Sequence, residues 1–123
     1  MPTWTLDELK RIAEATELDL ESERSDGSLR EPVTMWVVCA GDGIYVRSVK
    51  GRTGPWFRGA QAQRQGRISS GGVRKDVTFT DADPADWPSV DAAYHAKYDA
   101  YRGIVDRVLT QQARESTLKL LPR

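Results

Sequence analysis

One segment of the chain gathers the residue types that bind anions. Between Arg47 and Lys75 there are eight basic residues and six glycines, and no carboxylate. The whole chain has 18 basic and 18 acidic residues, so everything outside this segment carries 10 basic and 18 acidic residues, a net charge of −8. Glycine lets a backbone approach a ligand closely, and Arg and Lys form charge-assisted hydrogen bonds to phosphate. The segment is therefore predicted to bind an anion.

The most compact candidate site runs from Ser48 to Arg58, where a predicted strand ends and a predicted helix begins. A helix N-terminus presents unpaired N–H groups and a partial positive charge, and phosphates bind there. Lys50 and Arg52 add positive charge and Trp56 adds an aromatic face. The chain contains neither Gly-x-x-x-x-Gly-Lys-Ser/Thr nor Gly-x-Gly-x-x-Gly, so these two nucleotide-binding motifs are excluded. A solvated basic loop is the alternative interpretation.

Nucleic-acid binding is a second interpretation of the same segment. Basic residues together with Trp56 and Phe57 could hold a phosphate backbone and stack on bases. The isoelectric point of about 6.6 and the acidic remainder of the chain argue against this, because they repel a long polyanion. A small anionic ligand needs only a local positive patch and is the better prediction.

Metal chemistry finds little support in the sequence. Asp81, Asp83 and Asp86 lack the spacing and the closing glutamate of a calcium loop, and they fit a turn before a helix. One cysteine, Cys39, and one histidine, His95, are too few for a zinc site and exclude an intramolecular disulfide. No metal site is predicted.

Tyr94, Tyr98 and Tyr101 recur at helical spacing near the end of the chain. Aromatic residues in this pattern are typical of a packed helix face, and the sequence favours that interpretation. A tyrosine hydroxyl that reaches a pocket could still donate a proton.

The elements that must position these residues are short strands between helices. Thr5 and Glu8 have the spacing of a capping box, and Gly41 to Gly43 predicts a hairpin turn. The segment 33–40 is apolar on both faces, which indicates a central strand, and Gly103 is expected to kink or split the last helix. The expected elements are helices at 6–16, 56–65 and 89–109 and strands at 33–40, 44–49, 67–70, 73–80 and 117–121.

Length and composition indicate one α+β domain over residues 1–123, with a mainly antiparallel sheet or small barrel. Hydrophobic residues make up 39% of the chain and charged residues 29%, which is typical of a soluble globular protein. The longest apolar run, 35–40, is too short to cross a membrane, and the first residues lack the pattern of a signal peptide. We therefore expect a cytoplasmic protein with no membrane partner.

Several segments together carry a resemblance to a known family. They include Thr-Met-Trp-Val-Val at 34–38, Gly-Asp-Gly-Ile-Tyr-Val-Arg-Ser at 41–48 and Gly-Pro-Trp-Phe-Arg-Gly-Ala at 54–60, with further matches at 51, 71–72, 77–79, 91–94, 97–98 and 117–123. From about Trp4 onward the chain resembles a small bacterial family known only as a domain of unknown function. That family is grouped with the flavin-binding split β-barrels, which include pyridoxamine-phosphate-oxidase-like and deazaflavin-dependent nitroreductase-like proteins.

The resemblance implies a small antiparallel split β-barrel with flanking helices, a homodimer, and FMN or a deazaflavin bound at the subunit interface. Ser48, Lys50 and Arg52 would contact the phosphate. Thr34 and Trp36 would lie along the ring system. The implied cofactor-binding residues are Thr34, Trp36, Arg47, Ser48, Lys50, Gly51, Arg52, Trp56 and Arg58.

Two functions stay open at this point. One is a flavin- or deazaflavin-binding oxidoreductase, in which the cofactor performs the hydride chemistry and the protein orients it. The other is a non-catalytic dimeric split barrel that binds a small anionic ligand. The second is considered because the segment 33–40 has none of the basic residues that hold phosphate in pyridoxamine-phosphate-oxidase-like proteins. No catalytic residue is predicted.

Overall fold

A seven-stranded sheet forms the centre of the protein. The structure, a computed structural model, describes residues 3–123 apart from the side chain of Arg102. The sheet order is β2-β1-β5-β6-β7-β4-β3, and every neighbouring pair is antiparallel. This is the predicted α+β fold with an antiparallel split barrel. Its strands are β1 (Leu18–Ser22), β2 (Val33–Met35), β3 (Val38–Ala40), β4 (Gly43–Val46), β5 (Gln65–Ser70), β6 (Val73–Asp81) and β7 (Leu118–Pro122).

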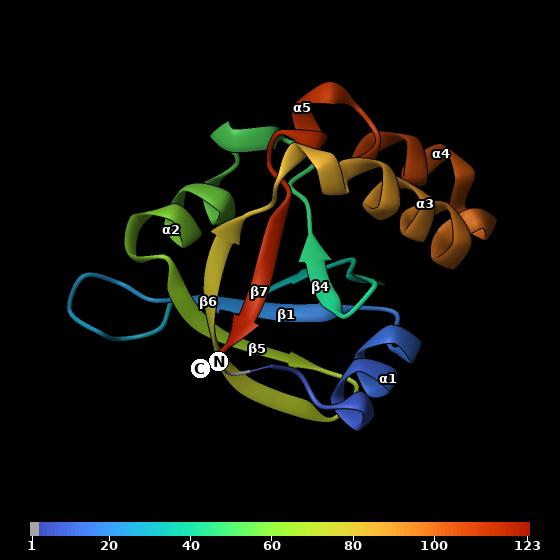
Figure 1. The fold of residues 1–123 in the computed structure, drawn as a ribbon. Coiled ribbons are helices and arrows are strands. Elements are labelled where there is room, and N and C mark those ends of the chain that lie inside the picture. Colours follow the sequence, from blue (N-terminus) through green and yellow to red (C-terminus); the bar gives the residue numbers. More distant parts are fainter. Residues whose placement is uncertain (1–2) are drawn as a thin grey trace.

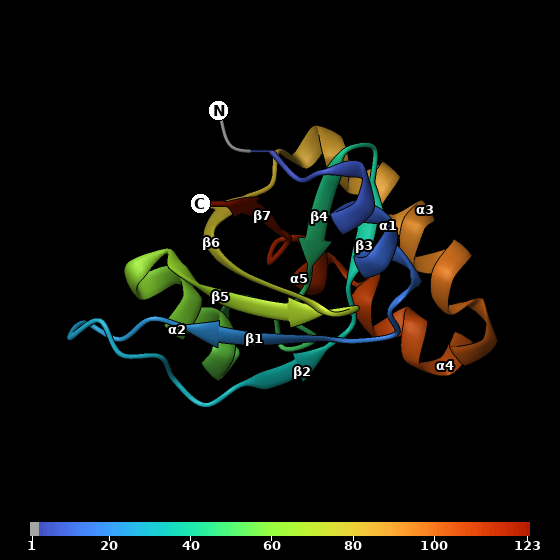
Figure 2. The ribbon, with the colours of Figure 1, turned by 90° about the horizontal axis from the view of Figure 1, so that it is seen from below.

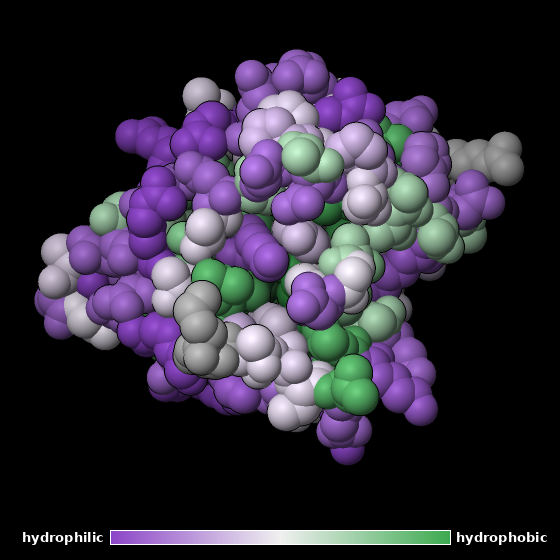
Figure 3. Space-filling view, in the orientation of Figure 1, coloured by the Kyte–Doolittle hydropathy of each residue, from purple (hydrophilic) through white to green (hydrophobic). Residues whose placement is uncertain are grey.

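Helices flank the curled sheet on several sides. In Figure 1, α3, α4 and α5 gather on one side of the barrel and α2 lies on the other. Hydrophilic side chains cover most of the face in Figure 3, and apolar groups show in its middle and lower part. None of the helices within residues 3–123 is long and apolar enough to cross a membrane. The helices are α1 (Leu6–Glu14), α2 (Pro55–Gln63), α3 (Trp87–Tyr98), α4 (Arg102–Val105) and α5 (Gln111–Arg114).

The two edges of the sheet belong to one continuous segment of chain. β2 and β3 stand at opposite ends of the strand order, yet only Trp36 and Val37 separate them in sequence. The sheet therefore curls until its edges meet at this break, and Figure 2 shows β2 and β3 running in different directions. The prediction of one central strand over 33–40 is wrong. The segment is apolar on both faces because it crosses from one edge of the barrel to the other.

β1 is a strand that the sequence did not predict. Leu18 and Leu20 are buried and alternate with Asp19 and Glu21, which are half-exposed. The acidic residues lower the strand propensity of the segment and mask this short alternation. β1 joins β2 to β5 and completes one wall of the barrel.

The last helix is shorter than predicted. α3 ends at Tyr98, and a series of short turns, including α4, covers residues 99–108. The helix is therefore interrupted before Gly103, the residue expected to split it. The predicted capping box on α1 is confirmed, since Thr5 and Glu8 each cap the other's backbone N–H.

The core has two parts. One fills the barrel and includes Leu20, Phe57 and Phe79. The other lies between the β3–β4 hairpin and α3 and includes Tyr94 and Tyr98, which are buried. The prediction of a packed face is confirmed for Tyr94 and Tyr98. It is wrong for Tyr101, which lies beyond the end of α3 and is 50% exposed.

Candidate functional site

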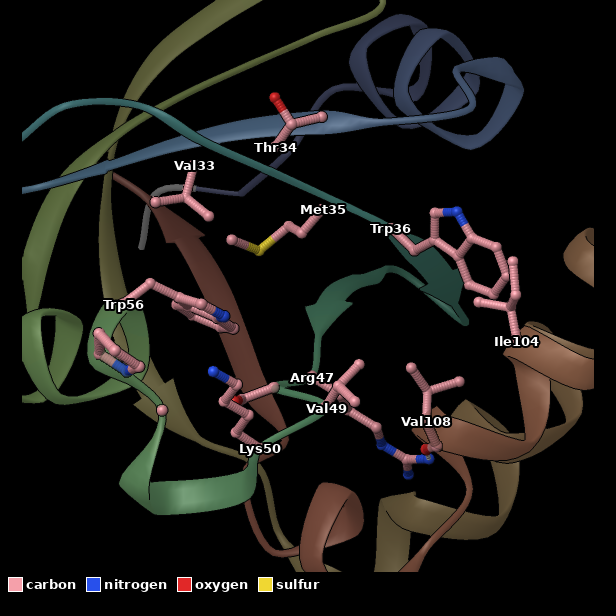
Figure 4. Close-up of a pocket in the computed structure, with 13 residues that line it drawn as sticks. Val33, Thr34, Met35, Trp36, Arg47, Val49, Lys50, Trp56, Ile104 and Val108 are labelled. Carbon is pink, nitrogen blue, oxygen red and sulfur yellow. Dashed lines mark hydrogen bonds between the residues drawn. The ribbon is translucent and has the colours of Figure 1, made fainter.

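A pocket of about 510 Å³ opens between β2, the chain that follows β4, the N-terminus of α2 and the turns around α4. Figure 4 shows its two ends. Lys50 and Trp56 lie at one end, and Trp36 and Ile104 lie at the other. Most of the lining is apolar, and small-molecule sites commonly combine such walls with a few polar groups. We call the two ends the polar end and the apolar end.

Ser48 supplies a hydroxyl at the polar end. The residue is 1% exposed, and its backbone N–H donates to the Ser116 hydroxyl at 2.8 Å, which fixes its position. The Ser48 hydroxyl makes no hydrogen bond with any protein group in the described part of the chain. A Cβ at Gly54 would lie only 2.6 Å from Ser48 Oγ, so a larger residue would crowd this hydroxyl. The polar end thus holds a hydroxyl that has no protein partner, next to a backbone position that carries no side chain.

The N-terminus of α2 adds further donors at the same place. Gly54 is its N-cap and Pro55 its first residue, and no side chain caps this end. N–H groups in the first turn of a helix have no partner within the helix, and the helix dipole favours an anion there. Lys50 lines the same end of the pocket. Hydroxyl, backbone and ammonium donors therefore converge where a phosphate-sized anion could bind.

Most of the basic segment is neutralised within the protein. Six of its eight basic side chains lie 2.5–3.9 Å from a carboxylate. Only Lys50 and Arg58 have no carboxylate partner among the described residues. Fewer positive charges are therefore available to a ligand than the composition of the segment indicates. The six pairs are Arg47–Asp91, Arg52–Asp81, Arg64–Asp81, Arg67–Asp76, Arg74–Glu21 and Lys75–Glu8.

Comparison with known families decides where this chain belongs. Residues 8–120 match the family described as "Uncharacterized protein conserved in bacteria (DUF2255)". The chain belongs to the DUF2255 family. The resemblance inferred from the sequence is thereby confirmed. No curated protein matches the sequence.

Solved structures share the fold of this DUF2255 protein. A conserved hypothetical protein, Rv2991, from Mycobacterium tuberculosis aligns with a TM-score of 0.67 and 11% identity, over 99% of this chain and 82% of its own. A FAD-binding protein from Mesorhizobium loti aligns with a TM-score of 0.60 and 12% identity, over 98% and 91%. An F420 reductase aligns with a TM-score of 0.52 and 15% identity, over 93% and 91%. At these identities the likeness establishes the fold.

Six of the nine residues that the resemblance implied line the pocket of the DUF2255 protein. The Thr34 hydroxyl donates to the Asp19 carboxylate at 2.6 Å and points away from the cavity in Figure 4. Whether these residues contact a cofactor stays a prediction. The six are Thr34, Trp36, Arg47, Ser48, Lys50 and Trp56.

Arg47 has a strong structural role in this site. Its side chain is fully buried, and its guanidinium pairs with Asp91 on α3 at 2.5 Å. It also donates to the Thr117 hydroxyl at 2.9 Å and to the Val108 carbonyl at 2.9 Å. These bonds tie the chain after β4 to α3 and to the start of β7, and they leave little of the guanidinium for a ligand.

Gly51, Arg52 and Arg58 do not line the pocket. Gly51 has a φ of 67°, and a Cβ there would lie 2.3 Å from a side-chain atom of Gln112, so this glycine is needed for close packing against α5. Arg52 donates to the Glu115 carbonyl at 2.9 Å. Arg58 is exposed on α2. Their predicted contacts with a cofactor stay untested.

The apolar part of the lining was not predicted as part of a site. Val33 lies on the side of Trp56 and Lys50, Met35 and Val49 lie between the two ends, and Ile104 and Val108 lie on the side of Trp36. Ile104 and Val108 fall within the helix that the sequence predicts over 89–109, where apolar residues at helical spacing indicate a core face. Apolar residues give the same periodic signal whether they face a core or a cavity, so no local pattern could have separated the two.

Candidate proton donors lie outside the pocket. Tyr94 is fully buried, and burial raises the pKa of its hydroxyl well above the usual value. Within residues 3–123 no carboxylate, histidine or cysteine lines the pocket.

Asp83 caps a short turn by accepting the Ala85 N–H at 2.9 Å, as the turn interpretation predicts. No group of three or more His, Cys, Asp or Glu side chains in the described part of the chain could hold a metal ion.

Proposed function

We propose that the pocket binds a flavin or a deazaflavin and that the protein is an oxidoreductase that depends on this cofactor. One observation carries the proposal. Ser48 is a buried residue that lines the pocket, its hydroxyl has no hydrogen-bond partner in the described chain, and it lies beside Lys50 and the uncapped N-terminus of α2 at one end of an apolar pocket. The shared fold with a FAD-binding protein and an F420 reductase supports it.

The residues present fit such a cofactor. At the polar end the Ser48 hydroxyl, the Lys50 ammonium and the first N–H groups of α2 would hold a phosphate. The absence of a side chain at Gly54 leaves room for it, since a Cβ would lie 2.6 Å from Ser48 Oγ. The apolar walls and Trp36 would take the ring system.

A bound flavin or deazaflavin supplies hydride transfer. The contribution of the protein is to bind and orient it. Of the described residues that line the pocket, only Arg47 and Lys50 are charged. Because Asp91 neutralises Arg47, Lys50 is the one lining charge that a ligand meets unpaired. The apolar lining excludes water from the ring and strengthens the electrostatic attraction between Lys50 and a phosphate.

A homodimer is part of the proposal. Val33, Val49 and Ile104 line the pocket and yet are 36%, 49% and 47% exposed. A second copy of the chain packed over them would cover apolar surface and enclose the ligand. Light scattering after size-exclusion chromatography measures the mass in solution, and a monomer at all concentrations tested would rule the dimer out.

A non-catalytic anion-binding protein is the second candidate. It is favoured by the lack of a carboxylate, histidine or tyrosine among the described pocket-lining residues, because no such side chain is present to exchange a proton with a substrate. It predicts that phosphate esters bind while flavins leave the spectrum unchanged.

The visible absorption spectrum separates the two. The purified protein is incubated with FMN and, separately, with a deazaflavin, and is then passed through gel filtration. We expect a bound-cofactor spectrum for wild type. We expect at least about tenfold weaker binding for Lys50→Ala and Ser48→Ala, because each loses a charge-assisted hydrogen bond to phosphate.

Lys10→Ala is the matched control, because Lys10 is an exposed lysine on α1, away from this pocket. It should take up cofactor as wild type does. A colourless protein with no uptake of either cofactor would refute the oxidoreductase proposal and favour the second candidate.

A further inference from the structure

Trp36 forms the wall of the apolar end, and its ring packs against a second aromatic side chain. Its ring stacks on the ring of Tyr98 with the centroids 3.9 Å apart and the planes only 4° from parallel. Tyr98 is 1% exposed and does not line the pocket, whereas Trp36 does. The indole therefore lies between the phenol of Tyr98 and the cavity.

The hydroxyl of Tyr98 is bound at the break between β2 and β3. It accepts the N–H of Val37 at 3.1 Å and donates to the Thr16 carbonyl at 2.6 Å. Burial raises the pKa of Tyr98 to about 12, so the hydroxyl keeps its proton at neutral pH. One side chain thus supports the Trp36 ring and also anchors the backbone of the next residue.

Lys97 completes the anchor. Its ammonium donates to the Val37 carbonyl at 2.7 Å, and burial lowers its pKa. Both backbone groups of Val37 are therefore satisfied by neighbouring side chains of α3, at a point where the chain has left one strand and not yet joined the next. A third ring, Tyr101, lies 5.8 Å from Trp36 at an angle of 51°.

If Tyr98 had only a structural role, its ring would not need to lie parallel to a residue that lines a cavity. A core tyrosine packs at many angles, and the buried hydroxyl of Tyr94, which does not line the pocket, has no hydrogen-bond partner among the described residues. Here the fixed residue is a pocket wall, and its flat face is held by a parallel ring and an anchored backbone. A rigid aromatic surface binds a planar ring with little loss of side-chain entropy on binding.

We propose that Trp36 is the stacking platform for a planar aromatic ring of the ligand and that Tyr98 is the positioning residue that holds this platform. The inference rests on the proposed function, which already puts the ring against the apolar walls and Trp36, and it adds that the ring stacks on the face of Trp36 that Tyr98 supports from behind. It assigns the ring and the phosphate to different residues of the same pocket.

Three probes test the two ends separately. FMN has both ring and phosphate, riboflavin has the ring alone, and ribose 5-phosphate has the phosphate alone. Dissociation constants are measured by quenching of flavin fluorescence, and ribose 5-phosphate is measured by competition with FMN. Tyr98→Phe keeps the phenyl ring and releases the Val37 N–H. We expect it to weaken FMN and riboflavin by the same factor, about tenfold, because one buried hydrogen bond is lost.

The affinity for ribose 5-phosphate should not change in Tyr98→Phe. Lys50→Ala should show the reverse pattern, with FMN and ribose 5-phosphate weakened and riboflavin unchanged. Tyr94→Phe is the matched control, since Tyr94 is a buried tyrosine one turn earlier on α3 and does not line the pocket. Its flavin affinities should equal those of wild type.

A second variant guards against misfolding. If circular dichroism shows that Tyr98→Phe is unfolded, Trp36→Phe on the pocket wall is tested in its place. Trp36→Phe should weaken the binding of riboflavin by a similar factor. Wild-type affinity for FMN and riboflavin in a folded Tyr98→Phe, or in Trp36→Phe, would overturn the inference while the proposed function stands. If wild type binds neither FMN, riboflavin nor a deazaflavin, the proposed function fails and the inference falls with it. If it binds only the deazaflavin, the same variants are titrated with that ligand, and wild-type affinity in a folded Tyr98→Phe overturns the inference.

Discussion

Gly54→Ala separates binding from folding more cleanly than any other single change in the pocket. The added Cβ would lie 2.6 Å from Ser48 Oγ and 3.4 Å from Lys50 Cβ, so it occupies the space that a phosphate oxygen needs. The backbone at Gly54 has φ −61° and ψ 139°, which alanine adopts without strain. The Ser48 side chain can rotate away from the new methyl group.

The energetic terms at this position nearly cancel for folding. Alanine at a helix N-cap is about 0.5–1 kcal/mol worse than glycine, and the smaller entropy of its unfolded chain restores about 0.4–1 kcal/mol. The free energy of unfolding should therefore change by no more than about 1 kcal/mol. A phosphate that loses one charge-assisted hydrogen bond loses about 1.5–3 kcal/mol, which weakens FMN binding by about 10- to 100-fold.

The assay is a fluorescence titration with FMN and with riboflavin, together with urea unfolding. Riboflavin has no phosphate and should bind Gly54→Ala as it binds wild type. Gly103→Ala is the control, because a Cβ at Gly103 meets no atom within 4 Å. Wild-type FMN affinity in a folded Gly54→Ala would refute the assignment of the phosphate to Ser48 and the N-terminus of α2.

Two further predictions concern ion pairs. Asp91→Asn should lower the free energy of unfolding by about 3 kcal/mol, because it leaves the fully buried guanidinium of Arg47 without its charged partner. Urea unfolding measures this free energy, and a loss under about 1 kcal/mol would contradict the prediction. Hydrogen bonding from Lys75 is the main cause that holds the pKa of Glu8 below 4.5, so the resulting stabilisation is present above that pH and is lost as the pH falls through the lower folded-state value. Glu8→Gln keeps a cap on the Thr5 N–H and removes the ion pair with Lys75. Carboxyl groups titrate between roughly pH 3 and 6, so over this span the stability of Glu8→Gln, measured by thermal unfolding, should vary less than that of wild type. Equal curves would exclude the pair as a stabilising contact.

Features set by neighbouring residues could be predicted from the sequence. The capping box at Thr5 and the hairpin turn at Gly41 to Gly43 depend on chain geometry within a few residues, and both are found. The break at Val37 could not be predicted, because what satisfies its backbone is Lys97 and Tyr98, far along the chain. A pattern within 33–40 contains no information about that contact.

Part of the candidate site could likewise be predicted from neighbouring residues, and part depends on distant contacts that the sequence does not show. Ser48, Lys50 and Trp56 lie at a strand end and a helix start, a local arrangement that the sequence makes visible, and all three line the pocket. Arg52 lies within the same few residues, but the Glu115 carbonyl and Asp81 draw its side chain elsewhere. Charge and spacing cannot predict that competition, since Glu115 belongs to a segment more than sixty positions away.

The position of β7 in the sheet has a consequence for the order of folding. β2, β1, β5 and β6 pair with one another within the first two thirds of the chain, and β3 and β4 form a local hairpin. β7 alone joins these two groups, because Leu120 pairs with both Phe79 and Ile44. Bringing distant segments together costs loop-closure entropy before the contacts stabilise it, which slows folding. We therefore expect docking of β7 to be the late, cooperative step that joins the two groups of strands and closes the barrel.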